Sequence, residues 1–209
     1  MAATELSVTS SAHPASPLRA WLYAYAAVWS ATLTAAAVVL LVGAPLSATT
    51  RGLLALSLHP GSTPTPTLRH MGALAAHNIP TAAWPLLLPI VGAARRGWSR
   101  ITADTLLAAC LIANTMPVGA AIAAYGSALA PYIPQLPLEW AGLALGAAAW
   151  LLERHQALSI HGRLRCLALI VVVLTSAAAL ETFAVPHETQ RASTSARRIS
   201  KVQPTINIT

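Results

Sequence analysis

A single carboxylate opens one of the apolar stretches of this chain. Glu139 begins the segment PLEWAGLALGAAAWLLERH, residues 137–155, whose middle is apolar enough to lie in a lipid bilayer. A carboxylate inside a membrane is costly unless it is paired, protonated or hydrated, and such residues usually serve a function. On a helix, Glu139 shares a face with Gly142 and Gly146. Their G-x-x-x-G spacing lets membrane helices approach closely, so we expect Glu139 to face another helix and not lipid.

Other polar residues lie among small residues in neighbouring apolar stretches. Asn78 lies shortly before a proline, Asn114 lies in the middle of a stretch, and Glu181 closes the last stretch. Glu139 and Glu181 are expected near the same end of their helices, and so near each other. Two interpretations stay open. The polar residues form a cluster for gating, ion contact or partner docking, or they hydrogen-bond between helices and only hold the bundle together.

No catalytic or cofactor motif accompanies these residues. The chain lacks H-E-x-x-H, G-x-S-x-G and the phosphate-binding G-x-x-x-x-G-K-[ST], and its only lysine, Lys201, lies near the C-terminus. Cys110 and Cys166 have no second ligand at metal-binding spacing. We therefore expect no catalytic residues, no cofactor and no metal. An intramembrane protease that uses Glu139, Glu181 and His77 is the enzymatic alternative.

The composition is that of a membrane protein. Hydrophobic residues make up 56% of the 209 residues and charged residues only 9%, with a mean hydropathy of +0.60. A soluble domain of this length needs a charged outer layer that 9% cannot supply. The net charge is +7, but no aromatic residues alternate with the arginines as a nucleic-acid stacking surface requires. We therefore expect the arginines to contact lipid headgroups and not nucleic acid.

The apolar stretches predict an all-α, multi-pass transmembrane helical bundle over residues 18–186, with spans that prolines break or kink. The tails, 1–17 and 187–209, are polar and predicted to be disordered. The run Gly52–Leu58 is too short to span a bilayer and is predicted to lie at its surface. The alternative is that this run forms part of a sixth, broken span. The five predicted spans are 21–42, 71–94, 101–125, 138–152 and 164–184, and Pro45 is expected to end the first of them.

The arginines predict which loops face the cytoplasm, because cytoplasmic loops carry the excess of basic residues. The loops 95–100 and 154–165 are arginine-rich, whereas the loop 126–137 has no charge. Five spans with the N-terminus inside satisfy both loops. They also place the basic C-terminal tail outside, against the rule, and that conflict stays open.

Four short motifs follow one another along the chain: an Asn in an early span (Asn78), an Asn with a later Gly (Asn114, Gly119), a Pro before a Glu (Pro134, Glu139), and a Glu with an aromatic and a Pro (Glu181, Phe183, Pro186). Their order resembles that of the SpoIIM (stage II sporulation protein M, or DUF95) family of integral membrane proteins. Two features depart from the family pattern. Gln135 and Leu136 stand where the family has His and Gly, and Thr115, not Gly, directly follows the asparagine. The resemblance covers residues 68–186, and the matched positions are Asn78, Asn114 with Gly119, Pro134 with Glu139, and Glu181 with Phe183 and Pro186.

The resemblance implies a helical membrane protein without known catalysis. Sporulation members belong to a membrane complex that organises peptidoglycan-degrading partners, and other members accompany ABC transporters or peptide-maturation systems. We expect a non-enzymatic structural component or scaffold in the inner (cytoplasmic) membrane of a bacterium, which would use the faces of small residues, such as Gly142 and Gly146, to hold its partners. Its partners would be lipid and other membrane proteins, including a cell-wall hydrolase complex. The alternative is a permease-like subunit of an ABC-type exporter or of a small-molecule or peptide transporter, with an ATP-binding-cassette partner. A homo-oligomer is also open.

Overall fold

A computed structural model describes residues 16–54, 66–92, 97–155 and 158–184 of the chain. Within these residues every regular element is a helix, so the predicted all-α class is confirmed for this part of the chain. The elements are α1 (Pro17–Val42), α2 (Ala44–Leu54), α3 (Leu68–Ala83), the 3-10 helix η1 (Trp84–Leu87), α4 (Trp98–Tyr125), the 3-10 helix η2 (Gly126–Tyr132), α5 (Leu136–His155) and α6 (Ile160–Phe183).

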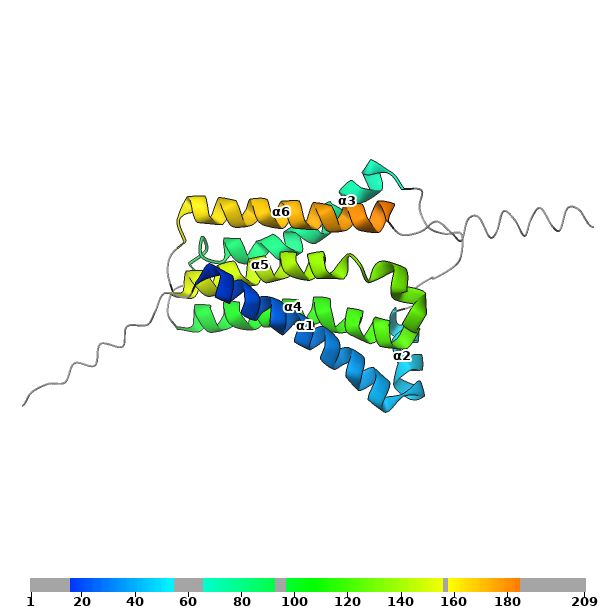
Figure 1. The fold of residues 1–209 in the computed structure, drawn as a ribbon. Coiled ribbons are helices and arrows are strands. Elements are labelled where there is room, and N and C mark those ends of the chain that lie inside the picture. The colour runs from blue at the N-terminus through cyan, green and yellow to red at the C-terminus, as the bar shows by residue number, and fades with distance from the viewer. Residues whose placement is uncertain (1–15, 55–65, 93–96, 156–157, 185–209) are drawn as a thin grey trace, which may run out of the picture.

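The long helices lie side by side and alternate in direction (Figure 1). α1, α4 and α6 run one way, α3 and α5 run the other way, and α2 lies at one end of the bundle. We name the two ends by their charged residues. The glutamate end holds Glu139 and Glu181. The arginine end holds arginines near the ends of four helices: Arg19, Arg100, Arg154, Arg163 and Arg165.

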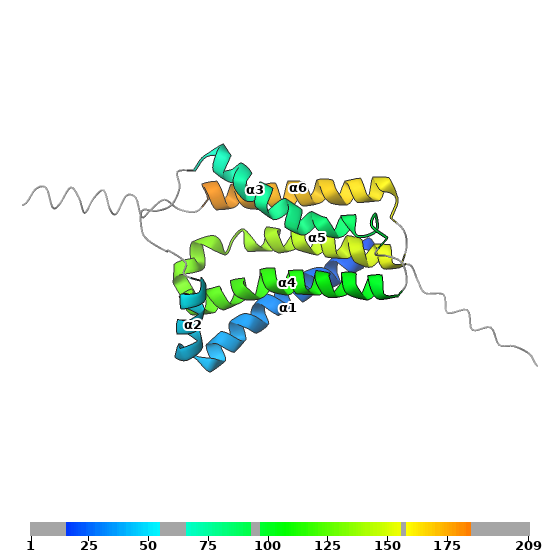
Figure 2. The same ribbon diagram turned by 180° about the vertical axis from the view of Figure 1, so that it is seen from behind.

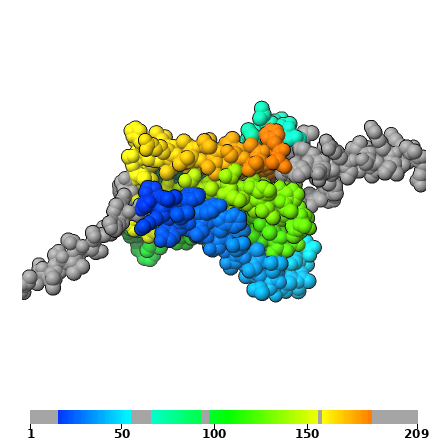
Figure 3. Space-filling view, viewed as in Figure 1, coloured from blue at the N-terminus to red at the C-terminus, as the bar shows by residue number. Residues whose placement is uncertain are grey.

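α5 forms the centre of the bundle. Its close backbone neighbours are α1, α3, η1 and α6, and its small residues allow these helices to approach it from several sides. In Figure 3, α1 lies across the front of the bundle below α6. The aromatic side chains of α1 also bind α5, since Trp21 Nε1 donates to the carbonyl of Ala141 and the Tyr25 hydroxyl donates to that of Pro137, both at 3.4 Å.

The outer surface of the described helices is apolar. Large aliphatic side chains are exposed along α1, α4 and α6, including Leu41, Leu106 and Val172. α1, α4 together with η2, and α6 are each long and apolar enough to cross a membrane. Such a surface suits lipid and would be unusual on a soluble monomer. α5 carries more charge, yet most of its surface contacts other helices and not the surroundings, because it lies at the centre.

The first predicted span is helical and ends at Val42 as expected, but it starts earlier, and the residue that stops it differs from the expectation. α1 already begins at Pro17, a residue well suited to the first turn of a helix. We expected Pro45 to end the span, and this is wrong. Gly43 ends α1 in a left-handed conformation (φ 79°) that favours glycine, and Pro45 lies in the first turn of α2. The helix expected over 52–58 therefore starts earlier, at Ala44, and residues 55–58 lie outside the described part.

Prolines act differently in the second and third predicted spans. The second span is broken as expected, because α3 ends at Ala83 and the chain continues through Pro85 as η1. A proline ring removes a backbone donor and clashes with the preceding turn. The expected break in the third span is wrong, since α4 stays helical through Pro117 as far as Tyr125. The uncharged loop that follows contains one further helical element, η2.

The remaining boundaries concern the fourth and fifth predicted spans and the tails. The fourth span lies within α5 and the fifth lies almost wholly within α6. The tails predicted to be disordered, 1–17 and 187–209, lie outside the described residues except for the start of α1. Of the last motif of the resemblance, Phe183 ends α6, and Pro186 is outside the described residues.

Candidate functional site

A cavity lined by both polar and apolar side chains lies between the helices, toward the glutamate end. Its volume is about 160 Å³, and α3, α4, α5 and α6 all line it. Three side chains singled out in the sequence, Asn78, Asn114 and Glu139, meet here. The other lining residues are Thr81, Val118, Trp140, Leu143 and Leu174. A polar cavity of this size has room for water, which is stabilised where several polar groups surround it.

The packing of the helices explains why this space is left open. The close neighbours of α4 are α1, α2 and η2, whereas α3 contacts α5, α6 and η1. α3 and α4 therefore do not pack closely against each other. Figure 2 shows them on either side of α5. The cavity lies between these two helices, and α5 contributes its floor.

Two glycines of α5 bring other helices close to it, as their G-x-x-x-G spacing predicts. A Cβ atom at Gly146 would overlap the carbonyl oxygen of Ala82 and lie 3.1 Å from its carbonyl carbon, so this glycine allows α3 to contact α5. A Cβ atom at Gly142 would lie 2.6 Å from Cδ2 of Leu174 on α6. The two glycines thus contact different helices, and both helices line the cavity.

Gly119 makes a third close contact. A Cβ atom there would overlap the backbone carbonyl of Thr32, so Gly119 lets α1 lie directly against α4. The glycines that we expected to hold partner proteins are already occupied by helices of the same chain.

The two amides and the hydroxyl of the cavity present acceptor oxygens. Asn114 Nδ2 donates to the carbonyl of Cys110 at 2.7 Å, which leaves its Oδ1 free to accept a hydrogen bond. The Thr81 hydroxyl donates to the carbonyl of His77 at 3.4 Å and keeps its lone pairs. Asn78 lines the same space from α3. The wall of the cavity therefore includes, beside its apolar side chains, oxygen atoms that can accept hydrogen bonds or bind cations.

Glu139 lies where this cavity meets a second one. The second cavity has a volume of about 330 Å³ and shares Glu139 and Val118 with the first. Glu181 of α6 also lines it, so the two carboxyls lie near each other as expected. Among the described residues, neither carboxyl forms a hydrogen bond or an ion pair. Pro134 is exposed in the turn before α5 and does not line either cavity, whereas its neighbour Gln135 is buried and lines the second one.

Trp140 gives the first cavity an unpaired donor. Its side chain is buried at 3% exposure, and its indole Nε1 has no hydrogen-bond partner within the described part of the chain. A buried donor without a partner costs about 1–3 kcal/mol. A water molecule in the cavity that Trp140 lines would supply the missing acceptor.

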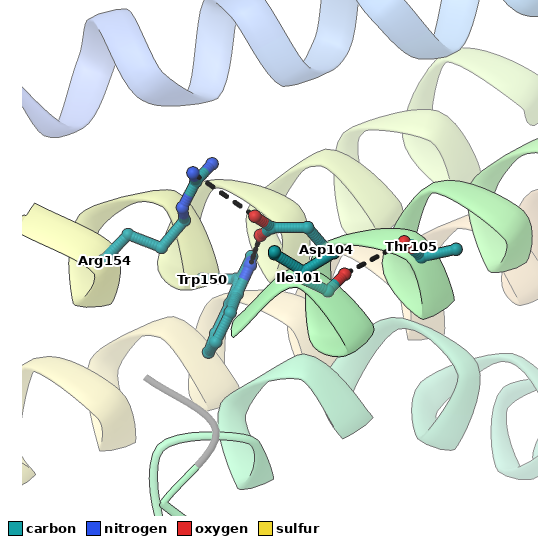
Figure 4. A network of polar contacts seen from close by, with 5 residues as sticks. All are labelled: Ile101, Asp104, Thr105, Trp150 and Arg154. Atoms are coloured by element: carbon teal, nitrogen blue, oxygen red, sulfur yellow. Dashed lines mark hydrogen bonds and ion pairs between the residues drawn. The ribbon is translucent and has the colours of Figure 1, made fainter. Parts of the chain in front are cut away.

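A second polar cluster lies at the arginine end, and sequence reasoning missed it (Figure 4). Trp150 is 1% exposed, and its Nε1 donates to Oδ1 of Asp104 at 2.7 Å. Arg154 pairs with Oδ2 of the same aspartate at 3.2 Å. Asp104 is the only aspartate of the chain, and this signal in the sequence could have drawn attention to it. The cluster fastens α4 to α5.

An ion pair next to this cluster fastens α5 to α6. Arg163 Nε lies 2.6 Å from Oε1 of Glu153, whose side chain is only 3% exposed. On the helical wheel Glu153 shares a face with Glu139, yet it lies at the opposite end of α5 and already has a partner. It therefore serves to hold the arginine end together and does not contribute to the cavity.

The other candidates from the sequence do not join the cavity. His77, the third residue of the protease alternative, is exposed on α3 and lines neither cavity. Cys110 and Cys166 are both free thiols. Within the described ranges, no three His, Cys, Asp or Glu side chains gather where they could hold a metal ion.

Comparison with known proteins finds no matching family model, no matching curated protein and no matching solved structure. The resemblance to the SpoIIM family therefore stays a prediction.

Proposed function

We propose that this chain is a non-enzymatic integral membrane subunit that provides a polar binding site inside the membrane, as a permease-like subunit of a transporter does. The observation that carries the proposal is the meeting of Asn78, Asn114 and Glu139 around one cavity. These residues come from three different helices. Polar side chains that only held helices together would be expected to bond across helices, whereas the amide nitrogen of Asn114 bonds within its own helix.

The broken second span supports the same proposal. Transporters often place their binding sites where a membrane helix is interrupted, because the interruption frees backbone groups near the middle of the bilayer. Here α3 gives way to η1 at Pro85, next to the helix that forms the floor of the cavity. The inner membrane of a bacterium is the proposed location, with five spans and the arginine end in the cytoplasm.

A purely structural subunit, as the SpoIIM resemblance implies, is the second candidate. That role was expected to use faces of small residues to hold partners. Because Gly119, Gly142 and Gly146 contact helices of this chain, a scaffold would have to bind its partners through the apolar outer faces of α1, α4 and α6. These faces are exposed and long enough for that purpose, so this candidate also has a structural basis.

The proteins that co-purify with the full chain distinguish the two candidates. We would tag the chain, extract it from its native membranes in mild detergent, and identify proteins recovered in near-stoichiometric amounts. Recovery of an ATP-binding-cassette ATPase or another transport subunit is the expected result. Recovery of a cell-wall hydrolase or a membrane scaffold would support the structural role instead. A homo-oligomer alone would contradict both and favour a channel or a protease.

A further inference from the structure

We propose that the cavity at Glu139 binds one monovalent cation, either a proton or Na⁺, which enters from the glutamate end. The inference goes beyond the role of a permease-like subunit, because it names the ligand of the cavity. It requires only that the bundle lies in a membrane, and it does not depend on which proteins co-purify with the chain.

The single carboxylate of the first cavity favours a ligand with one positive charge. Among the residues that the structure describes, Glu139 is the only ionisable one that lines the first cavity, and its polar neighbours Asn78, Thr81 and Asn114 are neutral. One carboxylate in a low-dielectric site is neutralised by one monovalent cation. Calcium and magnesium sites generally employ more carboxylates or keep several water ligands.

The available ligands suit a hydrated cation. Carboxylate, amide and hydroxyl oxygens are the groups that hard cations prefer. Asn114 bonds the Cys110 carbonyl through Nδ2, which leaves its Oδ1 available as a ligand. Trp140 lines the same cavity, and its buried Nε1 needs an acceptor. Water that accompanies a cation into the cavity would satisfy this donor if it reached Nε1, so the unpaired indole is compatible with a hydrated ligand.

The route to Glu139 is open on one side and closed on the other. The second cavity connects Glu139 to the glutamate end through a space of about 330 Å³. Toward the arginine end, the core closes around Leu107, Ala147 and Trp150. Trp150 also belongs to the Asp104 cluster, which joins α4 to α5 at this end. The structure therefore resembles one state of an alternating-access protein, open only toward the glutamate end.

The other ionisable groups around Glu139 come from several elements. Glu181 of α6 lines the second cavity together with Glu139, and His70 at the start of α3 is near enough to Glu181 to interact with it electrostatically. Tyr132 of η2 lines the second cavity, and Tyr25 of α1 binds the carbonyl of Pro137 nearby. The described cavity residues of α4 carry no ionisable group. A second negative charge at Glu181 would attract the cation to the entrance of the cavity.

Labelling with a carbodiimide tests the proposal. An apolar carbodiimide reacts with protonated carboxyls inside a membrane, and mass spectrometry of peptides locates the adduct. With the full chain in lipid vesicles, we expect Glu139 to be labelled and Glu153, buried in its ion pair with Arg163, to stay unlabelled as the internal control. Glu139→Gln removes the adduct and verifies its assignment.

The two cations give different results in this experiment. If the ligand is Na⁺, adding NaCl in place of choline chloride at constant pH and ionic strength slows labelling of Glu139. Asn114→Leu removes an oxygen ligand of the ion and should then raise the Na⁺ concentration that gives half protection about tenfold. If the ligand is a proton, labelling falls as the pH rises and Na⁺ has no effect.

Two results would overturn the proposal: labelling of Glu139 no faster than that of Glu153, or labelling that Na⁺ does not change and that is lost above about pH 4.3, as for an ordinary exposed glutamate. Should Asn114→Leu fail to fold, Asn78→Leu removes a different oxygen from the same cavity and takes its place. Neither outcome depends on a partner protein, so a failure here is distinct from a failure in the co-purification experiment.

Discussion

Replacing Gly146 by alanine should separate the two helices that build the cavity wall and floor. The added Cβ would overlap the carbonyl oxygen of Ala82 and lie 3.5 Å from Cγ of Pro85. The obstacle is a backbone group and cannot rotate away. Because a carbon and a carbonyl oxygen approach each other to about 3.3–3.6 Å, α3 and α5 would have to move apart by on the order of 1 Å.

The expected cost follows from this overlap. Overpacking a tightly fitted contact destabilises by about 1–3 kcal/mol, and a backbone obstacle places Gly146→Ala at the upper end of that range. For a chain of this length, each kcal/mol lowers the Tm by about 2–4 °C, so a loss of about 6–12 °C is expected. Gly142→Ala should cost less, because it meets the side chain of Leu174, which can change its rotamer.

Gly72→Ala is the matched control. A Cβ atom there has no neighbour within 4 Å, and Gly72 lies inside α3 where alanine favours the helix by up to about 1 kcal/mol. A thiol-reactive fluorophore that reports the exposure of Cys110 and Cys166 on heating measures the Tm in detergent, since both thiols are free and partly buried. A Gly146→Ala protein as stable as the Gly72→Ala protein would refute the close contact between α3 and α5.

Two further predictions concern the arginine end, and the same thermal assay checks both. Asp104→Leu leaves the buried Nε1 of Trp150 without a partner and should lower the free energy of unfolding by about 1–3 kcal/mol. Asp104→Asn keeps an acceptor for this donor and loses only the partly exposed pair with Arg154, which should cost about 0.2–1 kcal/mol. Equal losses in the two variants would contradict the role of the indole hydrogen bond. Arg163→Met leaves the buried carboxylate of Glu153 unpaired and should lower the free energy of unfolding by about 3–5 kcal/mol. Adding Glu153→Gln to the Arg163→Met protein removes the unpaired charge and should restore part of this stability. If it restores none, the ion pair is not what stabilises the contact between α5 and α6.

The elements that face lipid could be predicted well from the sequence. α1, α4 and α6 are long apolar runs, and their length and composition alone make them candidates for membrane crossing. The ends of helices were harder to place, because they depend on single residues. Gly43, and not Pro45, ends α1, since only the glycine readily adopts the left-handed conformation needed there.

The candidate site could be predicted in its residues but not in its assembly. The helical periodicity of Glu139, Gly142 and Gly146 indicates a packed face, yet it does not say which helices pack there. In the structure the two glycines contact α6 and α3, respectively. That arrangement brings Asn78 into the same cavity as Glu139. Such neighbours depend on the order of helices around α5, which no local pattern encodes.

The break at Pro85 and the continuous helix at Pro117 show the same limit. Both prolines remove a backbone donor, but only the first coincides with the end of a helix. α1 packs along α4, and at Gly119, two residues after the proline, a Cβ atom would overlap the backbone of α1. The residue type alone therefore does not predict the outcome at each proline, and the packing around it differs between the two.

The accessibility of a cysteine at position 118 to water tests the central claim most directly, because Val118 lines both cavities. Cys110 and Cys166 would first be replaced by alanine. Val118→Cys should then react in native membranes with a small charged methanethiosulfonate from the side that also labels Ser127→Cys at the glutamate end, and not from the side that labels Ser159→Cys. Leu106→Cys, on the exposed apolar face of α4, should stay unreactive. If Val118→Cys were as unreactive as Leu106→Cys, the cavity would be closed to water and could not be the binding site proposed for this protein.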